Sequence, residues 1–217
     1  MTTESFSERL VAANQPTWQA MAAHPFVLGL ASGTLPETAW RAWVQQDRVF
    51  VLEERRVVGA LRAQGLPPAL ERLCDQLDGA LAREAAAFAA EAERLGVAAD
   101  TEPWPVCLGY TSYLLEAARN GLLEGLVALF GVERAYLDTW TAVQASSPPG
   151  SRYHAWVENW TSEEFRAFVG ELGAQVDELA GSPPPALAAR LRTRLARVAR
   201  FELAFWEMAW RGWDWPA

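Results

Sequence analysis

Apolar residues recur at helical spacing along almost the whole chain, and this periodicity limits the fold more than any other feature. In the last long segment Leu191, Leu195 and Val198 follow one another at intervals of four and three residues, which places them on one face of a helix. The sequence has no alternating strand pattern bounded by turn residues. It therefore predicts an all-α multi-helix bundle. Because the Pro-rich loops are too short to be linkers, we expect a single domain over residues 1–217.

Proline, glycine and capping residues divide the chain into its expected helices. Thr34 or Leu35 is the expected cap of the second helix, with Pro36 in its first turn. Thr161 and Glu164 form a capping-box pattern at the start of another. The expected helical segments are about 4–23, from 34 or 35 to about 64, about 66–96, from 103 or 105 to about 121, 122–145, a short one from 152, a longer one from 161, and a last one after 185.

The charged residues exclude several classes of function. The net charge of −8 argues against a nucleic-acid partner. All 19 basic residues are Arg, and without Lys neither a Schiff base nor a P-loop is possible. Two Cys and two His, with no Glu-x-x-His pattern, predict no metal site, and we expect no cofactor. The one basic cluster, residues 189–200, is interpreted as a solvated helix face that pairs with acidic neighbours.

The sequence shows no sign of a membrane location. No apolar run approaches the length that crosses a bilayer, and residues 1–10 lack the basic start and apolar block of a signal peptide. The expectation from the sequence is a cytoplasmic protein without a membrane partner.

Three helices each place an acid where the apolar stripe calls for an apolar residue. Glu202 follows Val198 by four residues and precedes Phe205 by three. Asp47 lies three residues before Phe50 on its own stripe, and Glu133 interrupts the stripe of the segment 122–140. Since residues three and four apart share a helix face, all three acids are expected to point inward.

Each acid taken alone could be structural, paired with Arg or capping a buried donor. Three together favour a polar pocket, because an uncompensated buried carboxylate destabilises a domain whose whole stability is about 5–15 kcal/mol. Such a pocket would also hold the hydroxyls of four tyrosines, which are Tyr110, Tyr113, Tyr136 and Tyr153. Aromatic walls and carboxyl groups together suit a flat, polar, heteroaromatic ligand.

Five motifs, in order and at their spacing, resemble the TenA / thiaminase II family, which has a heme-oxygenase-like fold. The motifs are HPFVLGLASGTLP (24–36), QQDRVFVLEERR (45–56), YTSYLL (110–115), YHAWVENW (153–160) and FELAFWEMAW (201–210). The resemblance covers nearly the whole chain. It implies hydrolysis or salvage of thiamin-derived aminopyrimidines without a metal or organic cofactor, by a homo-oligomer that is a tetramer or a dimer.

The resemblance also implies roles for single residues. Asp47 would hold the amino group and ring nitrogen of the pyrimidine, and Tyr110 and Tyr136 would line the ring. The family usually has Tyr three residues after the Asp, where this chain has Phe50, so one hydroxyl is lost.

The catalytic end of the implied site departs from the better-known branch of the family. Glu202 would be the acid/base, with Tyr153 near it and Phe205 in the wall. The nucleophilic Cys of that branch is absent; Val132 stands at about its position, with Glu133 next to it. The chain looks like a Cys-lacking branch. We therefore expect Glu202 and Glu133 to act together, one activating water and the other protonating the departing amine.

Other functions remain open at this stage. One is a pyrimidine-binding protein without turnover. Another is an oxidase of the branch that makes pyrroloquinoline quinone, against which two His, no Lys and three inward acids argue. A third is heme binding through His24, although a His before Pro at a helix break is more often a loop residue. Cys107, three residues before Tyr110, is interpreted as a small core residue.

Overall fold

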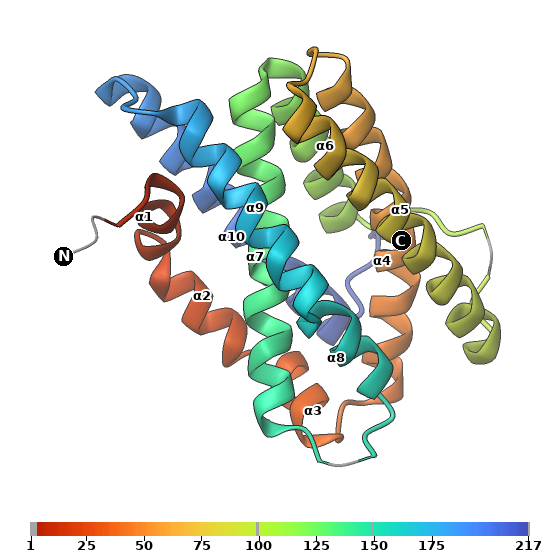
Figure 1. Ribbon diagram of the computed structural model, residues 1–217. Coiled ribbons are helices and arrows are strands. Elements are labelled where there is room, and N and C mark those ends of the chain that lie inside the picture. Colours follow the sequence, from red (N-terminus) through yellow and green to blue (C-terminus); the bar gives the residue numbers. More distant parts are fainter. Residues whose placement is uncertain (1–3, 99, 149, 217) are drawn as a thin grey trace.

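The structure, a computed structural model, describes residues 4–98, 100–148 and 150–216 (Figure 1). Within these ranges the chain forms helices and no strand, as the periodicity predicts. The helices are α1 (Phe6–Ala12), α2 (Gln15–Ala22), α3 (Pro25–Ser32), α4 (Glu37–Arg62), α5 (Pro68–Leu95), α6 (Pro105–Asn120), α7 (Leu122–Ser146), α8 (His154–Thr161), α9 (Glu163–Ala180) and α10 (Pro185–Arg211).

Helix α7 lies at the centre of the bundle, and α3, α6, α8, α9 and α10 pack against it (Figure 1). It is apolar nearly all round, which is typical of a helix surrounded by others. Two glycines let it approach its neighbours closely. A Cβ on Gly125 would lie 2.6 Å from the backbone of Ala118 in α6, and one on Gly131 would lie 2.8 Å from Val198 in α10. This close packing brings the following turn of α7, with Glu133, near α10.

The structure corrects the expected N-terminal helix. The segment 4–23 is two helices, α1 and α2, separated at Ala13 and Asn14, and Pro16 occupies the first turn of α2. The break expected at His24 and Pro25 starts a further helix, α3, which the periodicity did not predict. The ring nitrogen Nδ1 of His24 accepts a hydrogen bond from the backbone N–H of Phe26 at 3.2 Å and so caps α3.

Two expected caps are wrong by one or two residues. Helix α4 begins after Pro36, which is itself the N-cap residue in place of Thr34 or Leu35. The N-cap of α9 is Ser162, whose hydroxyl accepts from the N–H of Phe165 at 3.1 Å, while Thr161 ends α8. In both cases the observed N-cap lies one or two residues later in the chain than expected. Pro36 has a fixed φ, and Ser162 has a free hydroxyl that accepts from the backbone.

The Arg-rich part of α10 is less solvated than expected. Arg190 and Arg194 do pair with acids, but Arg194 is buried, between Glu116 of α6 and Glu124 of α7. Separately, within the described residues no helix is long and apolar enough to cross a membrane.

Candidate active site

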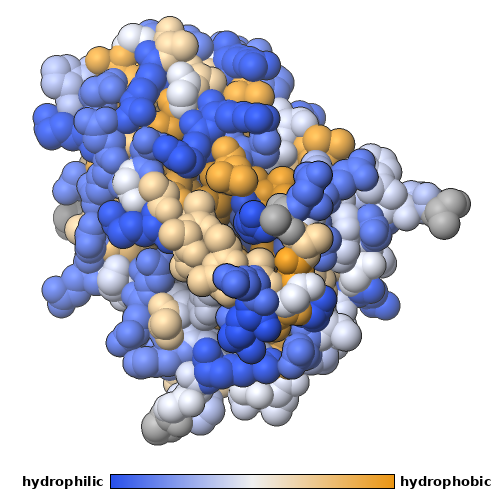
Figure 2. All heavy atoms as spheres, turned by 90° about the vertical axis from the view of Figure 1, so that its right-hand side faces the viewer, coloured by the Kyte–Doolittle hydropathy of each residue, from blue (hydrophilic) through white to orange (hydrophobic). Residues whose placement is uncertain are grey.

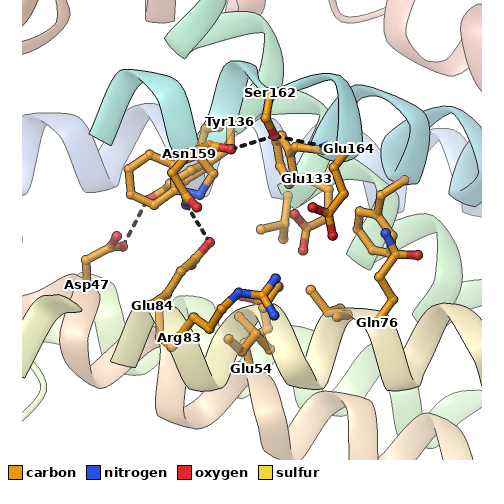
Figure 3. A pocket seen from close by; sticks show the side chains of 18 of the residues that line it. Asp47, Glu54, Gln76, Arg83, Glu84, Glu133, Tyr136, Asn159, Ser162 and Glu164 are labelled. Atoms are coloured by element: carbon orange, nitrogen blue, oxygen red, sulfur yellow. Dashed lines mark hydrogen bonds between the residues drawn. The ribbon is translucent and has the colours of Figure 1, made fainter. Parts of the chain in front are cut away.

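A cavity opens between α4 and α5 on one side and α7, α8 and α9 on the other (Figure 3). The space inside it, counted together with the open solvent at its mouth, is about 710 Å³. Apolar side chains make part of the wall. The polar part of the wall includes five carboxyl groups, which are Asp47, Glu54, Glu84, Glu133 and Glu164.

Asp47 is held at one end of the cavity by Tyr136. It lies on the buried face of α4, where burial raises its pKa well above the usual value. The hydroxyl of Tyr136 donates to Oδ1 of Asp47 at 2.8 Å, and this bond opposes the rise (Figure 3). The second oxygen is not used in this bond, so the carboxyl group retains an atom that can bind a ligand.

Glu202 lies one layer deeper, behind the cavity wall. The hydroxyl of Tyr110 in α6 donates to its Oε1 at 2.5 Å. The ring of Phe50, which lines the cavity, packs 5.1 Å from the ring of Tyr110 and 5.7 Å from that of Phe205. Burial raises the pKa of Glu202 to about 8, against the opposing effect of the Tyr110 bond.

Glu133 reaches the same cavity from α7, and Glu54 reaches it from α4. Burial raises the pKa of Glu133 to about 8, and the charges of Glu84 and Glu202 add to this. The pKa of Glu54 is also raised well above its usual value, by burial first and then by the charge of Glu133.

Glu54 and Glu84 are site residues that sequence reasoning missed. Glu54 follows Asp47 by seven residues, which is two helical turns, so the shared face was a usable signal. No comparable signal marks Glu84 in the Ala-rich part of α5. Its Oε1 accepts from Nδ2 of Asn159 in α8 at 2.9 Å, and burial raises its pKa to about 7.

The cavity is rich in acids and poor in cations. Among the residues described as lining it, Arg83 is the only basic one, and its side chain is exposed. No group of three or more His, Cys, Asp or Glu within the described residues is arranged to hold a metal ion. Several acids whose pKa values are raised toward neutrality can exchange protons with a substrate at physiological pH, which is the property of a catalytic acid/base site.

Comparison with known proteins identifies the family. The model of the TENA/THI-4/PQQC family matches residues 11–212. The chain belongs to this family. A protein named aminopyrimidine aminohydrolase from Halalkalibacterium halodurans is 29% identical, over 97% of this chain and 98% of its own. One of the same name from Bacillus subtilis is 28% identical, over 96% of this chain and 92% of its own.

Solved structures agree with this assignment. A TenA homologue from Pyrococcus furiosus superimposes with a TM-score of 0.88 and 29% sequence identity, over 94% of this chain and 99% of that one. The likeness confirms the expected all-α, heme-oxygenase-like bundle of the TenA proteins.

The TenA resemblance names residues that the fold mostly brings together. Asp47, Phe50 and Tyr136 line the cavity, and Tyr110 and Phe205 lie behind Phe50.

Tyr153 is the exception among the residues that the TenA resemblance implies. Its ring packs 4.8 Å from Trp40, and its hydroxyl contacts the guanidinium of Arg152. Trp160, seven residues later, lines the cavity from α8. The structure does not bring Tyr153 to the cavity or give it a hydrogen bond to Glu202.

Val132, which the TenA resemblance puts at about the position of the absent nucleophile, lines the cavity beside Glu133. Cys107 is fully buried, and its thiol donates weakly to the backbone oxygen of Gln46 at 3.6 Å. Burial and the charge of Asp47 raise the pKa of this thiol, so a reactive thiolate is disfavoured there. Its position fits the expected small core residue.

Neither histidine belongs to the cavity. His24 caps α3 and its Nε2 lies 2.9 Å from Oε2 of Glu207. His154 is exposed and lies 3.2 Å from Glu158 on the same helix. The two rival readings that depend on histidines, heme binding and quinone oxidation, therefore gain no support from the site.

Proposed function

We propose that this protein is a thiamin-pyrimidine salvage hydrolase that acts on an aminomethyl-pyrimidine or its N-formyl derivative. Relatives named aminopyrimidine aminohydrolase, similar over nearly their whole length, support the reaction class. For this chain, the proposal rests on the position of Asp47. Its carboxyl group is buried, oriented by Tyr136, and faces a cavity shared with Glu133. An oriented carboxyl group can pair with the adjacent amino group and ring nitrogen of an aminopyrimidine.

The catalytic groups in this proposal are Glu133 and Glu202. With the aminomethyl substrate, a water oxygen bonds to the exocyclic carbon and the C–N bond breaks, giving the hydroxymethyl-pyrimidine and ammonia. With the N-formyl substrate, water adds to the formyl carbon, giving formate and the amine. In both cases one carboxylate takes a proton from water, and one carboxylic acid gives a proton to the departing nitrogen.

The rest of the site orients the ring. Phe50 forms part of the cavity wall, and Tyr110 and Phe205 pack behind it in tilted and edge-on contact. Phe50 packs without contributing a hydroxyl, so the ring is held by apolar contact on that side.

The test is incubation of the purified protein with thiamin, an aminomethyl-pyrimidine and its N-formyl derivative, with products followed by mass spectrometry. We expect turnover of one or both pyrimidines, with thiamin untouched. If isothermal titration showed binding of both pyrimidines and no product formed, the protein would be a binding protein without turnover. Cleavage of thiamin would indicate that a thiolate nucleophile is present after all. The variant Cys107→Ser would then test whether Cys107 is that nucleophile.

We also propose that the protein is a homo-oligomer, a dimer or a tetramer. Figure 2 shows apolar side chains gathered within the hydrophilic surface of one face. Large apolar side chains exposed to solvent include Leu52 of α4 and Leu108 of α6, and exposed apolar surface of this kind favours association. Sedimentation equilibrium measures the mass directly. A mass of 24.0 kDa, that of one chain, would contradict the proposal.

A further inference from the structure

Glu54 is a buried acid that the proposed chemistry leaves without a role. It is only 4% exposed, and its Oε1 has no hydrogen-bond partner among the residues that the structure describes. A buried acceptor without a donor costs free energy, so this oxygen is expected to have a partner in the working protein. Because Glu54 lines the cavity from α4 (Figure 3), a molecule bound in the cavity can supply the donor.

The hydrogen-bond donors of the cavity wall serve other acids or lie in solvent. Among the described residues that line the cavity, Tyr136 gives its hydroxyl proton to another carboxyl group, and the side-chain amide of Asn159 donates to Glu84. Arg83 is the only basic residue among them, and its side chain is exposed. The other carboxyl groups of the wall only accept hydrogen bonds when they are ionised. Oε1 of Glu54 therefore remains open to a donor from a ligand.

The place of Glu54 in the cavity matches the reacting end of the proposed substrate. Glu54 follows Asp47 by seven residues, so both lie on the buried face of α4, two turns or about 10 Å apart along the helix. Glu133 lines the cavity from α7, on the opposite side (Figure 3). A pyrimidine ring that pairs with Asp47 can therefore extend its exocyclic group along α4, between Glu54 and Glu133.

The two proposed substrates differ in the charge of the exocyclic nitrogen. An aminomethyl group is an alkyl amine, so it is positively charged at neutral pH, as Lys is, and offers three N–H donors. The nitrogen of the N-formyl derivative is a neutral amide with one N–H. Burial raises the pKa of Glu54 well above its usual value, and a cation beside the carboxyl group favours its charged form. A bound ammonium group thus supplies a countercharge that no buried residue described in the cavity wall provides.

We infer that Glu54 binds the exocyclic ammonium group of an aminomethyl-pyrimidine, which favours this substrate over its neutral N-formyl derivative. The inference rests on the proposed function and chooses between its two substrates. The ammonium N–H donates a charge-assisted hydrogen bond to Oε1 of Glu54. The role of Glu54 is in binding, and the reaction at Glu133 and Glu202 follows once the complex has formed.

The test compares kcat/KM for the aminomethyl-pyrimidine and for the N-formyl derivative in the wild type and in Glu54→Gln. Gln keeps the shape of the side chain and removes its charge. We expect the ratio of the two values, amine over formyl, to fall about tenfold or more in this variant, as expected when a hydrogen bond to a charged group is lost. An unchanged ratio, whether or not both values fall together, would overturn the inference.

Glu53→Gln is the matched control for this experiment. Glu53 is the neighbour of Glu54 on α4, but it pairs with Arg56 at 2.7 Å and is not among the described residues that line the cavity. The same change of charge on the same helix should therefore leave the ratio of the two kcat/KM values at that of the wild type. A fall of the ratio in both variants would mean a general effect of charge and would also overturn the inference.

A binding experiment distinguishes failure of this inference from failure of the proposed function. If the wild type turns over neither pyrimidine, the proposed function fails. Titration calorimetry then compares the aminomethyl-pyrimidine with the hydroxymethyl-pyrimidine, which has the same ring and a neutral exocyclic group. We expect the amine to bind about tenfold or more tightly than the alcohol in the wild type, and with similar affinity in Glu54→Gln. Equal affinities in the wild type, or no binding of the amine, would overturn the inference.

Discussion

Two buried polar clusters in this bundle have opposite compositions. Around Arg194, the guanidinium lies 2.5 Å from Glu116 and 2.5 Å from Glu124, and its carbon lies 4.8 Å from the centre of the Tyr113 ring. The cavity cluster is Asp47, Glu54 and Glu133, which line the cavity, with Glu202 behind its wall. The hydrogen-bond donors to Asp47 and Glu202 are tyrosine hydroxyls, and the nearby charges are those of other acids.

This difference in composition distinguishes charged residues that stabilise the fold from charged residues that serve the site. The Arg194 cluster joins α6, α7 and α10 with opposite charges, so stability of the fold is a sufficient reason for it. Burial first, and the like charges of its members second, raise the pKa values in the cavity cluster, and this weakens the folded state near neutral pH. A cluster that destabilises the fold beside a cavity is better explained by the chemistry it performs.

The largest expected effect is the loss of activity in Glu202→Gln. Removal of a general acid or base lowers kcat by roughly 10²–10⁴-fold, and the isosteric amide leaves the packing around Tyr110 intact. Steady-state kinetics with the better pyrimidine substrate measures the change, and thermal unfolding serves as the control. Full activity in this variant would remove Glu202 from the mechanism.

Arg194→Met is expected to lower the stability of the fold and to leave kcat unchanged, which is the opposite of Glu202→Gln. This change leaves Glu116 without its cation and Glu124 with only the longer contact to Arg190. The loss of one partner of a buried pair destabilises by about 3–5 kcal/mol. Glu116 is half exposed, so we expect the lower end, about 3 kcal/mol, in urea unfolding. The kcat of the folded variant should be unchanged. A stable variant with reduced kcat would show that the two clusters are coupled.

A smaller effect is expected on KM, and it should differ between Tyr136→Phe and Tyr153→Phe. Tyr136→Phe leaves the buried Asp47 oxygen without its donor, which costs about 1–3 kcal/mol and should raise KM about tenfold. Tyr153→Phe removes a hydroxyl that contacts Arg152 outside the cavity, so its KM and kcat should stay within about twofold of the wild type. Equal losses in both variants would place Tyr153 in the site, as the family motif implies.

A further expected effect is a change of the unfolding free energy with pH. The pKa values of Glu133 and Glu202 are about 8 in the folded protein, against a usual value near 4.5 when unfolded. Their protonation stabilises the fold fully below about pH 4.5, and this contribution is lost as the pH rises through 8. Each group lowers the unfolding free energy by at most about 1.4 kcal/mol per pH unit in that window.

Urea unfolding at several pH values between 5 and 8 measures this slope. Glu202→Gln should flatten it, because the amide does not titrate. Arg194→Met should lower the whole curve and leave its slope unchanged. A flat curve in the wild type would mean that the cavity acids are ionised in the folded protein.

Residue patterns predicted the buried acids but not all of their neighbours. The stripes of α4, α7 and α10 correctly placed Asp47, Glu133 and Glu202 on inward faces. Glu54 shares the face of Asp47, but the charged run Glu53, Glu54, Arg55, Arg56 looks like a solvated surface when it is read alone. Burial of one residue in such a run depends on the helix packed against it.

The sequence by itself determined the all-helical class, the inward faces of the long helices and the chemistry that the absence of Lys excludes. Spacing of three and four residues is a property of one helix, so it can be read without its partners. Only the tertiary structure decided which inward faces meet: that Glu54 and Glu133 line one cavity, that Glu84 joins them, and that Tyr153 packs on Trp40 outside it. The reason is that these pairings depend on how all the helices pack at once, through close approaches such as Gly131 against Val198.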